Sequence, residues 1–347
     1  MKKIAIFNEG NSYYSTFILL VKGFIENKFQ ITYYSLDKED KILNIESDYL
    51  KKIIIKKNFF GYLKFYQIDA DVLISTTPNI GCKGYPLMKP RKVKNLVHVF
   101  HSISDISIYR KGSLDNYDSV ILAGEFQKKS IRYLEKLRGL KIKKLYNLGV
   151  PYIDYLINEK RNLKQVKNKN FNVLVASSWG KKGCLMTYGT NFIKELSLKY
   201  DVTVRPHPYS YITEKSFIQK CVKELSDTNV NWSKDIDPLN DLNKADILIS
   251  DTSSIRFDYK VLYNKPLITL SIDSIEMDDY ERNYLNHDWI SDSDKLIGPV
   301  LNKTSIMNLN NIVEKAKSKK NNKSLRKNII YNQGLASRKI VEFFIKN

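Results

Sequence analysis

The stretch from residue 245 to residue 259 (ADILISDTSSIRFDY) constrains the fold of this chain more than any other segment. Residues 247–250 are largely aliphatic, which is typical of a buried strand. Three hydroxyl residues at 252–254 then stand where a helix start favours them, and an apolar helical pattern follows. A strand that leads directly into a helix presents free N–H groups at the positive end of the helix dipole. The stretch therefore predicts a phosphate-binding turn.

The rest of the chain alternates between strand and helix patterns. In the first half we expect strands at 3–8, 30–35, 52–55, 71–75, 94–100, 119–123 and 143–148, and helices at 13–26, 59–67, 124–137 and from 152. In the second half we expect strands at 172–176, 202–205, 230–232, 246–250 and 267–270, and helices at 185–200, 214–225, 238–244 and 324–345. This alternation predicts an α/β fold of two Rossmann-like, doubly wound domains that face each other across a cleft.

The length of 347 residues suits two domains. The polar stretch at 159–170 is predicted to be a linker between an N-terminal Rossmann-like domain (1–158) and a second one (171–323). A terminal helix (324–347) would follow. Ligands of open α/β sheets lie at the carboxyl ends of the strands, so residues just after strands are the functional candidates.

The composition excludes several classes of protein. A hydrophobic fraction of 43% with 14 glycines and 9 prolines argues against a disordered or fibrous chain. No apolar run approaches the roughly 20 residues of a membrane helix. The first apolar run ends at Asn8, which predicts a strand rather than a signal peptide. The three cysteines have no disulfide or metal-ligand spacing, so we expect a cytoplasmic protein.

The net charge of +20 has two interpretations. Lysine, asparagine and isoleucine are abundant throughout, so a compositional bias alone explains the charge. Alternatively, the charge serves binding, and the clearest segment is then 56–64 (KKNFFGYLK), where lysines mix with aromatic residues. That mixture suits an anionic membrane surface better than a nucleic-acid groove. We therefore expect no nucleic-acid partner, and peripheral attachment to the inner face of the cell membrane stays open.

Two histidines belong to the strand pattern at 94–100. His98 lies inside it and is predicted to be a core residue, whereas His101 stands at its exit. An imidazole there suits a base that accepts a proton from a hydroxyl near neutral pH, with Asp105 orienting the ring. A purely structural role for His101 is the alternative.

Residues that directly follow other predicted strands carry groups that could bind an anion. Arg205 and His207 follow the strand pattern at 202–205 and form a compact basic pair between two prolines. The alternatives are a rigid proline loop and a salt bridge from Arg205 to a nearby helix. The loop at 177–183 (SSWGKKG) suits a phosphate or nucleotide but matches neither a Walker loop nor a dinucleotide fingerprint. An ordinary solvated strand-to-helix loop is the alternative. His287 is predicted to be structural, and neither a zinc site nor any other cofactor is expected.

Four segments, taken in chain order, resemble the CDP-glycerol glycerophosphotransferase family, which includes teichoic-acid polymerases and primases. They are the strand-end His101, VLVASSWG (173–180), VRPHP (204–208) and ADILISDTSSIRFDY (245–259), with Lys265-Pro266 beyond. The resemblance implies a GT-B fold, with the donor held mainly by the second domain. It also implies metal-independent transfer of glycerol phosphate from CDP-glycerol to a hydroxyl, with release of CMP.

The resemblance implies a role for each matching residue. His101 is similar to the general base of the family. The residues expected at the donor phosphates and nucleotide are Arg205, His207, Ser250, Thr252, Ser253, Ser254, Ser178, Trp179 and Gly180. Apart from the resemblance, Gly10, Asn11 and Ser102 are expected on the acceptor side. Asp251 is expected to shape its turn by accepting backbone hydrogen bonds or to orient a basic side chain, because a carboxylate would repel phosphate.

The resemblance leaves the substrates partly open, because His101-Ser102-Ile103 stands where many members have His-Gly-Thr. We expect a CDP-activated, CDP-glycerol-like donor and a glycan or polyprenyl-linked acceptor, as in synthesis of a cell-surface polysaccharide. A GT-B glycosyltransferase with a nucleotide-sugar donor is the second hypothesis, because the fold alone does not choose the chemistry. A non-enzymatic module that binds anionic lipid or nucleic acid is the third.

Overall fold

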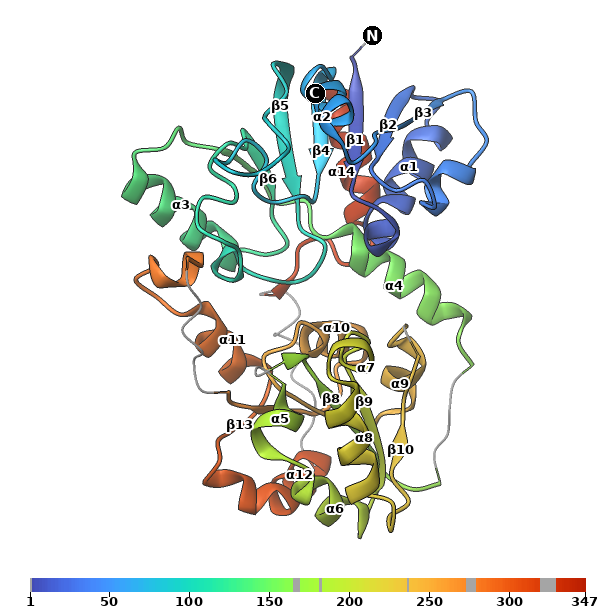
Figure 1. Cartoon of the computed structure of the whole chain (residues 1–347), viewed down its shortest axis with the longest axis vertical. Coiled ribbons are helices and arrows are strands. Elements are labelled where there is room, and N and C mark those ends of the chain that lie inside the picture. The colour runs from blue at the N-terminus through green and yellow to red at the C-terminus, as the bar shows by residue number, and fades with distance from the viewer. Residues whose placement is uncertain (1, 165–168, 181–182, 236, 273–278, 319–328) are drawn as a thin grey trace. The chain divides into compact units, whose positions relative to one another are not determined.

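The computed structural model describes residues 2–164, 169–180, 183–235, 237–272, 279–318 and 329–347. The chain forms two compact units (Figure 1). The first comprises Met1–Asn158, Asp278–Asp288 and Lys327–Asn347, and the second comprises Glu159–Met277 and Trp289–Arg326. Among the described residues, no helix is both long enough and apolar enough to cross a membrane.

The first unit is built on a seven-stranded parallel sheet with the order β3-β2-β1-β4-β5-β6-β7. Its strands are β1 (Ile4–Asn8), β2 (Ile31–Ser35), β3 (Leu50–Ile54), β4 (Asp69–Ser75), β5 (Lys92–Val99), β6 (Ser119–Ile121) and β7 (Lys144–Tyr146). Its helices are α1 (Tyr14–Glu26), α2 (Phe59–Tyr66), α3 (Phe126–Arg138) and α14 (Ala336–Lys346), and α4 (Pro151–Asn162) leads out of it. The strand order reverses between β1 and β4, which marks the place where such sheets bind ligands.

The first sheet is covered on both faces. Every residue of β1 is buried, and its side chains alternate between two hydrophobic clusters. Ile4 and Ile6 pack with α1 and α14, whereas Ala5 and Phe7 pack with α2 and α3. A continuous aliphatic run is what a strand buried on both faces requires, and this is why the N-terminal run forms β1.

The second unit has a six-stranded parallel sheet with the order β10-β9-β8-β11-β12-β13. The strands are β8 (Asn172–Ser177), β9 (Asp201–Pro206), β10 (Asn231–Trp232), β11 (Ile247–Ser250), β12 (Leu267–Leu270) and β13 (Val300–Leu301). The helices are α5 (Cys184–Tyr188), α6 (Asn191–Ser197), α7 (Ser210–Thr213), α8 (Lys215–Glu224), α9 (Leu239–Lys244), α10 (Ile255–Tyr263), α11 (Trp289–Ile297) and α12 (Leu309–Ser318). Here the order reverses between β8 and β11.

The predicted α/β class with two doubly wound parallel sheets is confirmed. One predicted helix is wrong, because residues 185–200 form two helices, α5 and α6. Gly189, with a φ of +67°, ends α5 and turns the chain. The sequence predicted no helix at α7, α11 or α12 and no strand at β13.

The units differ from the predicted domain boundaries in three places. Helix α4 runs to Asn162, into the stretch predicted as a linker, of which residues 165–168 lie outside the described residues. Residues 278–288 belong to the first unit, although the sequence placed them in the second domain. There Glu281 is fully buried and paired with Arg138 of α3. The terminal helix α14 also belongs to the first unit, and it begins at Ala336 because residues 331–335 form bends and turns. Residues 324–328 of the predicted helix lie outside the described residues.

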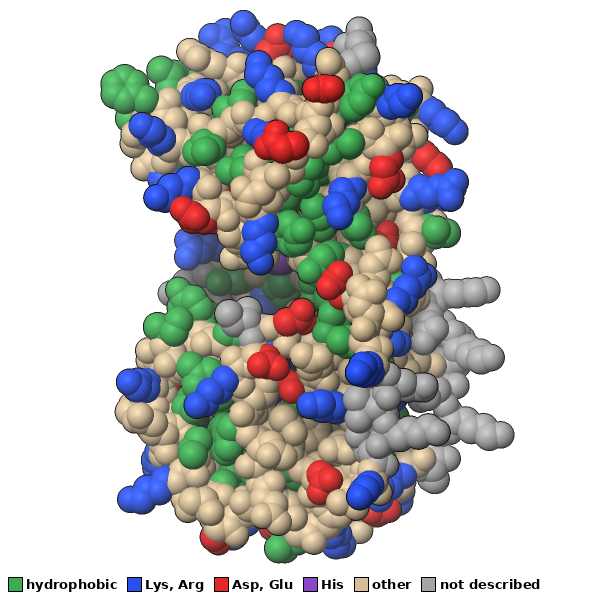
Figure 2. Space-filling view, turned by 90° about the vertical axis from the view of Figure 1, so that its right-hand side faces the viewer, with side chains coloured by type: hydrophobic (Ala, Val, Ile, Leu, Met, Phe, Trp, Pro, Cys, Tyr) green, Lys and Arg blue, Asp and Glu red, His purple; other side chains and the backbone are tan. Residues whose placement is uncertain are grey.

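The basic side chains do not gather in one patch on the face in view in Figure 2. Lysine and arginine side chains are scattered over both units, with acidic side chains between them. On this face the distribution is what the compositional interpretation of the +20 charge predicts.

Candidate active site

Asp251 joins two strand exits at the point where the order of the second sheet reverses. Its carboxylate is fully buried and accepts four hydrogen bonds. The donors are Ser178 N (2.8 Å), Ser178 Oγ (2.6 Å), Cys184 N (2.8 Å) and Ser253 N (3.1 Å). Loss of hydration raises the pKa of Asp251, and these hydrogen bonds oppose that shift. The predicted role of Asp251 in shaping its turn by accepting backbone hydrogen bonds is confirmed, and the same carboxylate fixes the loop after β8.

Arg256 holds the other side of the turn. Its guanidinium is 1% exposed and donates from Nε to Ser253 O (3.0 Å). Its Nη1 donates to Thr269 Oγ1 of β12 (2.9 Å) and to Asp294 of α11 (2.5 Å). The turn at 251–254 is thus anchored at its buried side by hydrogen bonds from both Asp251 and Arg256, which hold the start of α10 in place.

The hydroxyl residues of the turn do not lie in equivalent places. Thr252 and Ser254 are exposed, and Ser253 is half-buried. Ser250 is fully buried and donates from Oγ to Ala176 O of β8 (2.7 Å), so its hydroxyl ties two strands together. The structure brings the residues at 252–254 to the surface of the turn and does not bring Ser250 there.

The loop after β8 carries the predicted Ser178, Trp179 and Gly180. Trp179 is 53% exposed, and its ring centroid lies 5.7 Å from that of Tyr209, which is 54% exposed and follows β9. Gly180 has a φ of +72°, a conformation that favours glycine. Two exposed aromatic rings therefore stand beside the Asp251 turn. Sequence reasoning missed Tyr209, although an aromatic residue directly after Arg205-Pro206-His207-Pro208 was a usable signal.

Arg205 and His207 have different surroundings. Arg205 is 5% exposed, and its Nη1 donates to Asp241 of α9 (2.7 Å) and to Ser233 Oγ (3.1 Å). This is the salt bridge to a helix that the sequence offered as an alternative for Arg205. His207 is exposed, and its Nδ1 accepts from Tyr209 N (3.1 Å). Loss of hydration, followed by the charge of Arg205, lowers the pKa of His207, so the ring is neutral at pH 7.

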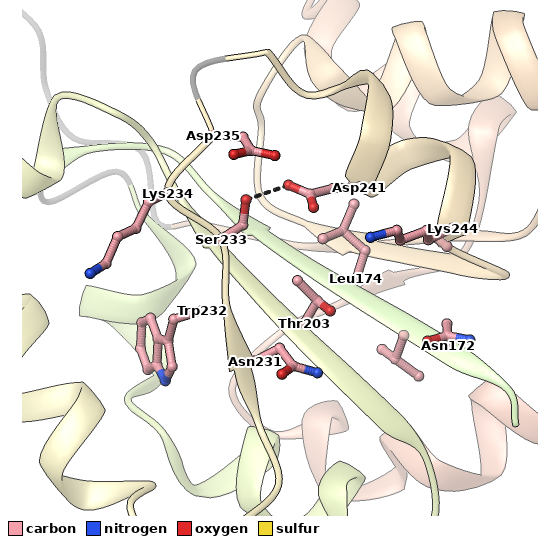
Figure 3. Close-up of a pocket in the computed structure, with 12 residues that line it drawn as sticks. Asn172, Leu174, Thr203, Asn231, Trp232, Ser233, Lys234, Asp235, Asp241 and Lys244 are labelled. Atoms are coloured by element: carbon pink, nitrogen blue, oxygen red, sulfur yellow. Dashed lines mark hydrogen bonds between the residues drawn. The ribbon is translucent and has the colours of Figure 1, made fainter. Parts of the chain in front are cut away.

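A cavity of about 440 Å³ lies on the face of the second sheet beside α9 (Figure 3). Ser233 and Asp241, which are hydrogen-bonded to each other at 2.5 Å, line it together with Trp232 and Lys244. It reaches the amino end of β8 at Asn172 and includes none of the residues at 251–254. The cavity is therefore separate from the turn that Asp251 organises.

His101 follows β5 in the first unit, next to the exit of β4. Its Nδ1 lies 3.1 Å from Thr76 Oγ1, and its ring meets Tyr13 edge to face at 5.0 Å between centroids. Burial lowers the pKa of His101 to about 4. The imidazole is therefore neutral at pH 7, as a general base requires. Asp105, expected to orient this ring, instead accepts a hydrogen bond from Ser107 N (2.9 Å). Thr76 is the side chain hydrogen-bonded to His101.

His98 is confirmed as a core residue. It is fully buried, its Nε2 lies 3.2 Å from Tyr109 Oη, and the rings of Phe100 and Tyr117 meet it edge to face. His287 lies in the first unit, with Nε2 3.0 Å from Ser130 Oγ.

The acceptor-side candidates hold loops in shape. Gly10 has a φ of +146°, and a Cβ added there would lie 2.8 Å from Asp37. Asn11 donates from Nδ2 to Glu39 O (2.5 Å) and accepts at Oδ1 from Lys41 N (2.9 Å). Ser102 donates to Ser104 Oγ (3.0 Å). Gly10 and Asn11 thus lie at the exit of β1, and Ser102 lies beside His101.

Residues 104–346, well over half of the chain, match the family profile described as CDP-Glycerol:Poly(glycerophosphate) glycerophosphotransferase. The chain belongs to this family. It is accordingly an enzyme of the glycerophosphotransferase type. The match includes the Asp251 turn, the loop after β8 and Arg205-Pro206-His207-Pro208, whereas His101 lies just before it. A search of curated proteins gave no match.

Solved structures of three proteins show the same fold at low sequence identity. The wall teichoic acid polymerase TagF, as a variant soaked with CDPG, is 15% identical over 99% of this chain and 88% of that chain, with a TM-score of 0.58. A UDP-N-acetylglucosamine 2-epimerase is 14% identical over 99% and 96%, with a TM-score of 0.62. A glycosyltransferase from Rickettsia africae ESF-5 is 14% identical over 99% and 98%, with a TM-score of 0.60. The expected GT-B-like fold class is confirmed.

Proposed function

We propose that this glycerophosphotransferase-family enzyme moves glycerol phosphate, or a related polyol phosphate, from a CDP-activated donor to a hydroxyl of a cell-surface glycan or lipid-linked acceptor. The observation that carries the proposal is the pair of strand exits that Asp251 joins in the second unit. Both exits lie within the residues that match the family. The exposed turn at 252–254 offers hydroxyls and the start of α10 to a phosphate, and the Trp179–Tyr209 pair offers aromatic faces to a nucleoside.

The proposed chemistry needs a base and stabilisation of a leaving nucleotide. His101 Nε2 takes the proton of the acceptor hydroxyl while Nδ1–H donates to Thr76 Oγ1. The hydroxyl oxygen then forms a bond to the outer phosphorus of the donor, and the bond from that phosphorus to the bridging oxygen breaks. CMP leaves with the electron pair. In this proposal the N–H groups at the start of α10 and the exposed His207 ring donate hydrogen bonds to the phosphates, and Arg205, ion-paired with Asp241, supports the loop that carries His207. The proposed step is metal-independent.

A panel of nucleotide donors tests this function. CDP-glycerol and CDP-ribitol are compared with UDP-sugars and CMP-sugars by thermal shift and by product release. We expect a CDP-polyol to stabilise the protein and to release CMP when an acceptor is present. Release of a nucleoside diphosphate from a sugar donor would support a GT-B glycosyltransferase instead.

We also propose that the enzyme attaches to an anionic membrane surface through α2. Phe59 and Phe60 are 74% and 77% exposed, and Leu63 is 41% exposed. The exposed Lys56, Lys57 and Lys64 flank these three apolar side chains. Adjacent apolar and basic side chains suit the boundary between lipid headgroups and acyl chains, where a lipid-linked acceptor would lie. Localisation at the inner face of the cell membrane follows from this proposal.

A further inference from the structure

Glu9 stands at the exit of β1, where the strand order of the first sheet reverses. Its Oε1 accepts a hydrogen bond from Tyr85 Oη (3.0 Å). Within the described residues, Oε2 has no hydrogen-bond partner. Loss of hydration raises the pKa of Glu9, against the Tyr85 hydrogen bond and the charge of Lys57. Glu9 is therefore a half-buried carboxylate at the carboxyl edge of the first sheet. Tyr85 holds one of its oxygens, and the other oxygen can bind a ligand.

Tyr13 connects Glu9 with His101. The Tyr13 ring lies 5.0 Å from the His101 ring, centroid to centroid. Its hydroxyl has no hydrogen-bond partner in the described part of the chain, and the charge of Glu9 adds to the effect of burial in raising its pKa. Glu9, Tyr13 and His101 thus leave three polar groups for a ligand at the carboxyl edge of one sheet. The proposed mechanism uses only His101.

The chemistry of these groups selects the kind of ligand. A carboxylate accepts hydrogen bonds from hydroxyls and repels phosphate, so this edge suits the hydroxyl end of a substrate. The rings of Tyr13 and Tyr85 add flat apolar faces that suit the C–H surface of a sugar or polyol. Lys57, whose charge acts on Glu9, precedes α2, so the edge adjoins the proposed membrane-binding helix.

We propose that Glu9 and Tyr13 bind the polyol or sugar hydroxyls of the acceptor and hold the attacking hydroxyl against His101. This inference rests on the proposed function and deepens it, because it names the residues that recognise the acceptor. Glu9 accepts hydrogen bonds from one or two hydroxyls through Oε2, and Tyr85 keeps the carboxylate in place.

Glu9→Gln tests the inference, because an amide oxygen still accepts from Tyr85 while the negative charge is lost. The probes are CDP-glycerol as donor and a glycerol-terminated oligo(glycerol phosphate) as acceptor. We expect the acceptor KM to rise about 10- to 100-fold, because a charge-assisted hydrogen bond to the acceptor is lost. The Kd of CDP-glycerol should stay the same. Glu39→Gln, which changes a glutamate with a 74% exposed side chain in the same unit, is the matched control and should leave both constants unchanged.

A direct binding measurement separates this inference from the proposed function. In saturation-transfer NMR at one acceptor concentration, the glycerol protons of the acceptor should receive equal magnetisation from the wild-type protein and from Glu39→Gln, and much less from Glu9→Gln. Equal signals from all three proteins, or none from the wild type, would overturn the acceptor site. Failure of CDP-glycerol to bind or react would overturn the proposed function while this NMR result still decides the role of Glu9.

Discussion

In the proposed mechanism His101 is the base, and the loss of hydration around its half-buried ring sets the pH range in which it can act. An unperturbed imidazole is half protonated near pH 6.5. Burial lowers the pKa of His101 to about 4, so the proton acceptor is available at any pH well above 4. The rate therefore falls on the acid side only as the pH approaches 4.

We predict that the pH–rate profile of the wild type shows no loss of the base between pH 5 and 8. His101→Asn should lower kcat by about 10²- to 10⁴-fold, the usual contribution of a general base, with the Kd of CDP-glycerol unchanged. Steady-state kinetics across this pH range and calorimetry of donor binding measure both. An acid limb centred near pH 6.5, or full turnover by the variant, would remove His101 from this role.

Asp251 gives a residue-scale prediction about stability. In Asp251→Asn an NH₂ group replaces one carboxylate oxygen, and that oxygen accepts two hydrogen bonds in the wild type. The NH₂ group is itself a donor, so the two donors that met this oxygen lose their acceptor at a fully buried position. Each buried group left unsatisfied costs about 1–3 kcal/mol. We expect a clear fall in the free energy of unfolding and weaker binding of CDP-glycerol.

Urea unfolding and donor calorimetry test the effect of Asp251→Asn. Asp227→Asn is the control, because Asp227 lies in the same unit and its ion pair with Lys194 is exposed. The control should unfold and bind as the wild type does. Equal stability of the two variants would mean that the hydrogen bonds of Asp251 do not hold the two loops.

Among the helices and strands, the sequence correctly predicted those that depend on nearby residues alone. The strand at 247–250, the turn and helix α10 follow from apolar spacing and from residues that favour helix starts. The partners of the site residues were not predictable in this way. Thr76 reaches His101 because β4 and β5 are adjacent in the sheet, and Asp241 reaches Arg205 from a helix further along the chain. Both contacts depend on topology, which spacing along the chain does not encode.

Helix α2 carries a prediction of its own. Phe59→Ser with Phe60→Ser removes two exposed rings, so the fold should stay intact while burial in a membrane is lost. Full burial of one phenylalanine side chain is worth about 1.5–3 kcal/mol, so binding to vesicles with anionic lipid should weaken at least tenfold. Flotation with vesicles measures this binding. Leu198→Ser, at a leucine that is 80% exposed on the second unit, should bind as the wild type does. Unchanged flotation of the double variant would exclude α2 as the attachment site.

At the scale of the whole molecule, the two ends of the chain fold in one unit. Lys2 Nζ donates to Phe344 O (3.0 Å), and α14 packs against α1 and β1. The second unit is thus formed by the middle of the chain. Sequence reasoning expected an N-terminal domain, a second domain and a terminal helix in simple order. It could not place residues 278–288, because their partners, such as Arg138, lie more than a hundred residues earlier in the chain.

This arrangement predicts that damage near the C-terminus loosens the N-terminal strands. Phe344 is 1% exposed, and replacing a buried phenylalanine by alanine costs about 3–5 kcal/mol. In Phe344→Ala, amide hydrogen exchange should therefore accelerate in β1, β4 and α1 and stay unchanged in β8 and β11, which belong to the other unit. Leu335→Ala, at a half-exposed leucine just before α14, should exchange as the wild type does. Equal acceleration in β8 and β11 would show that the units unfold together, and none in β1 would show that α14 does not support the first sheet.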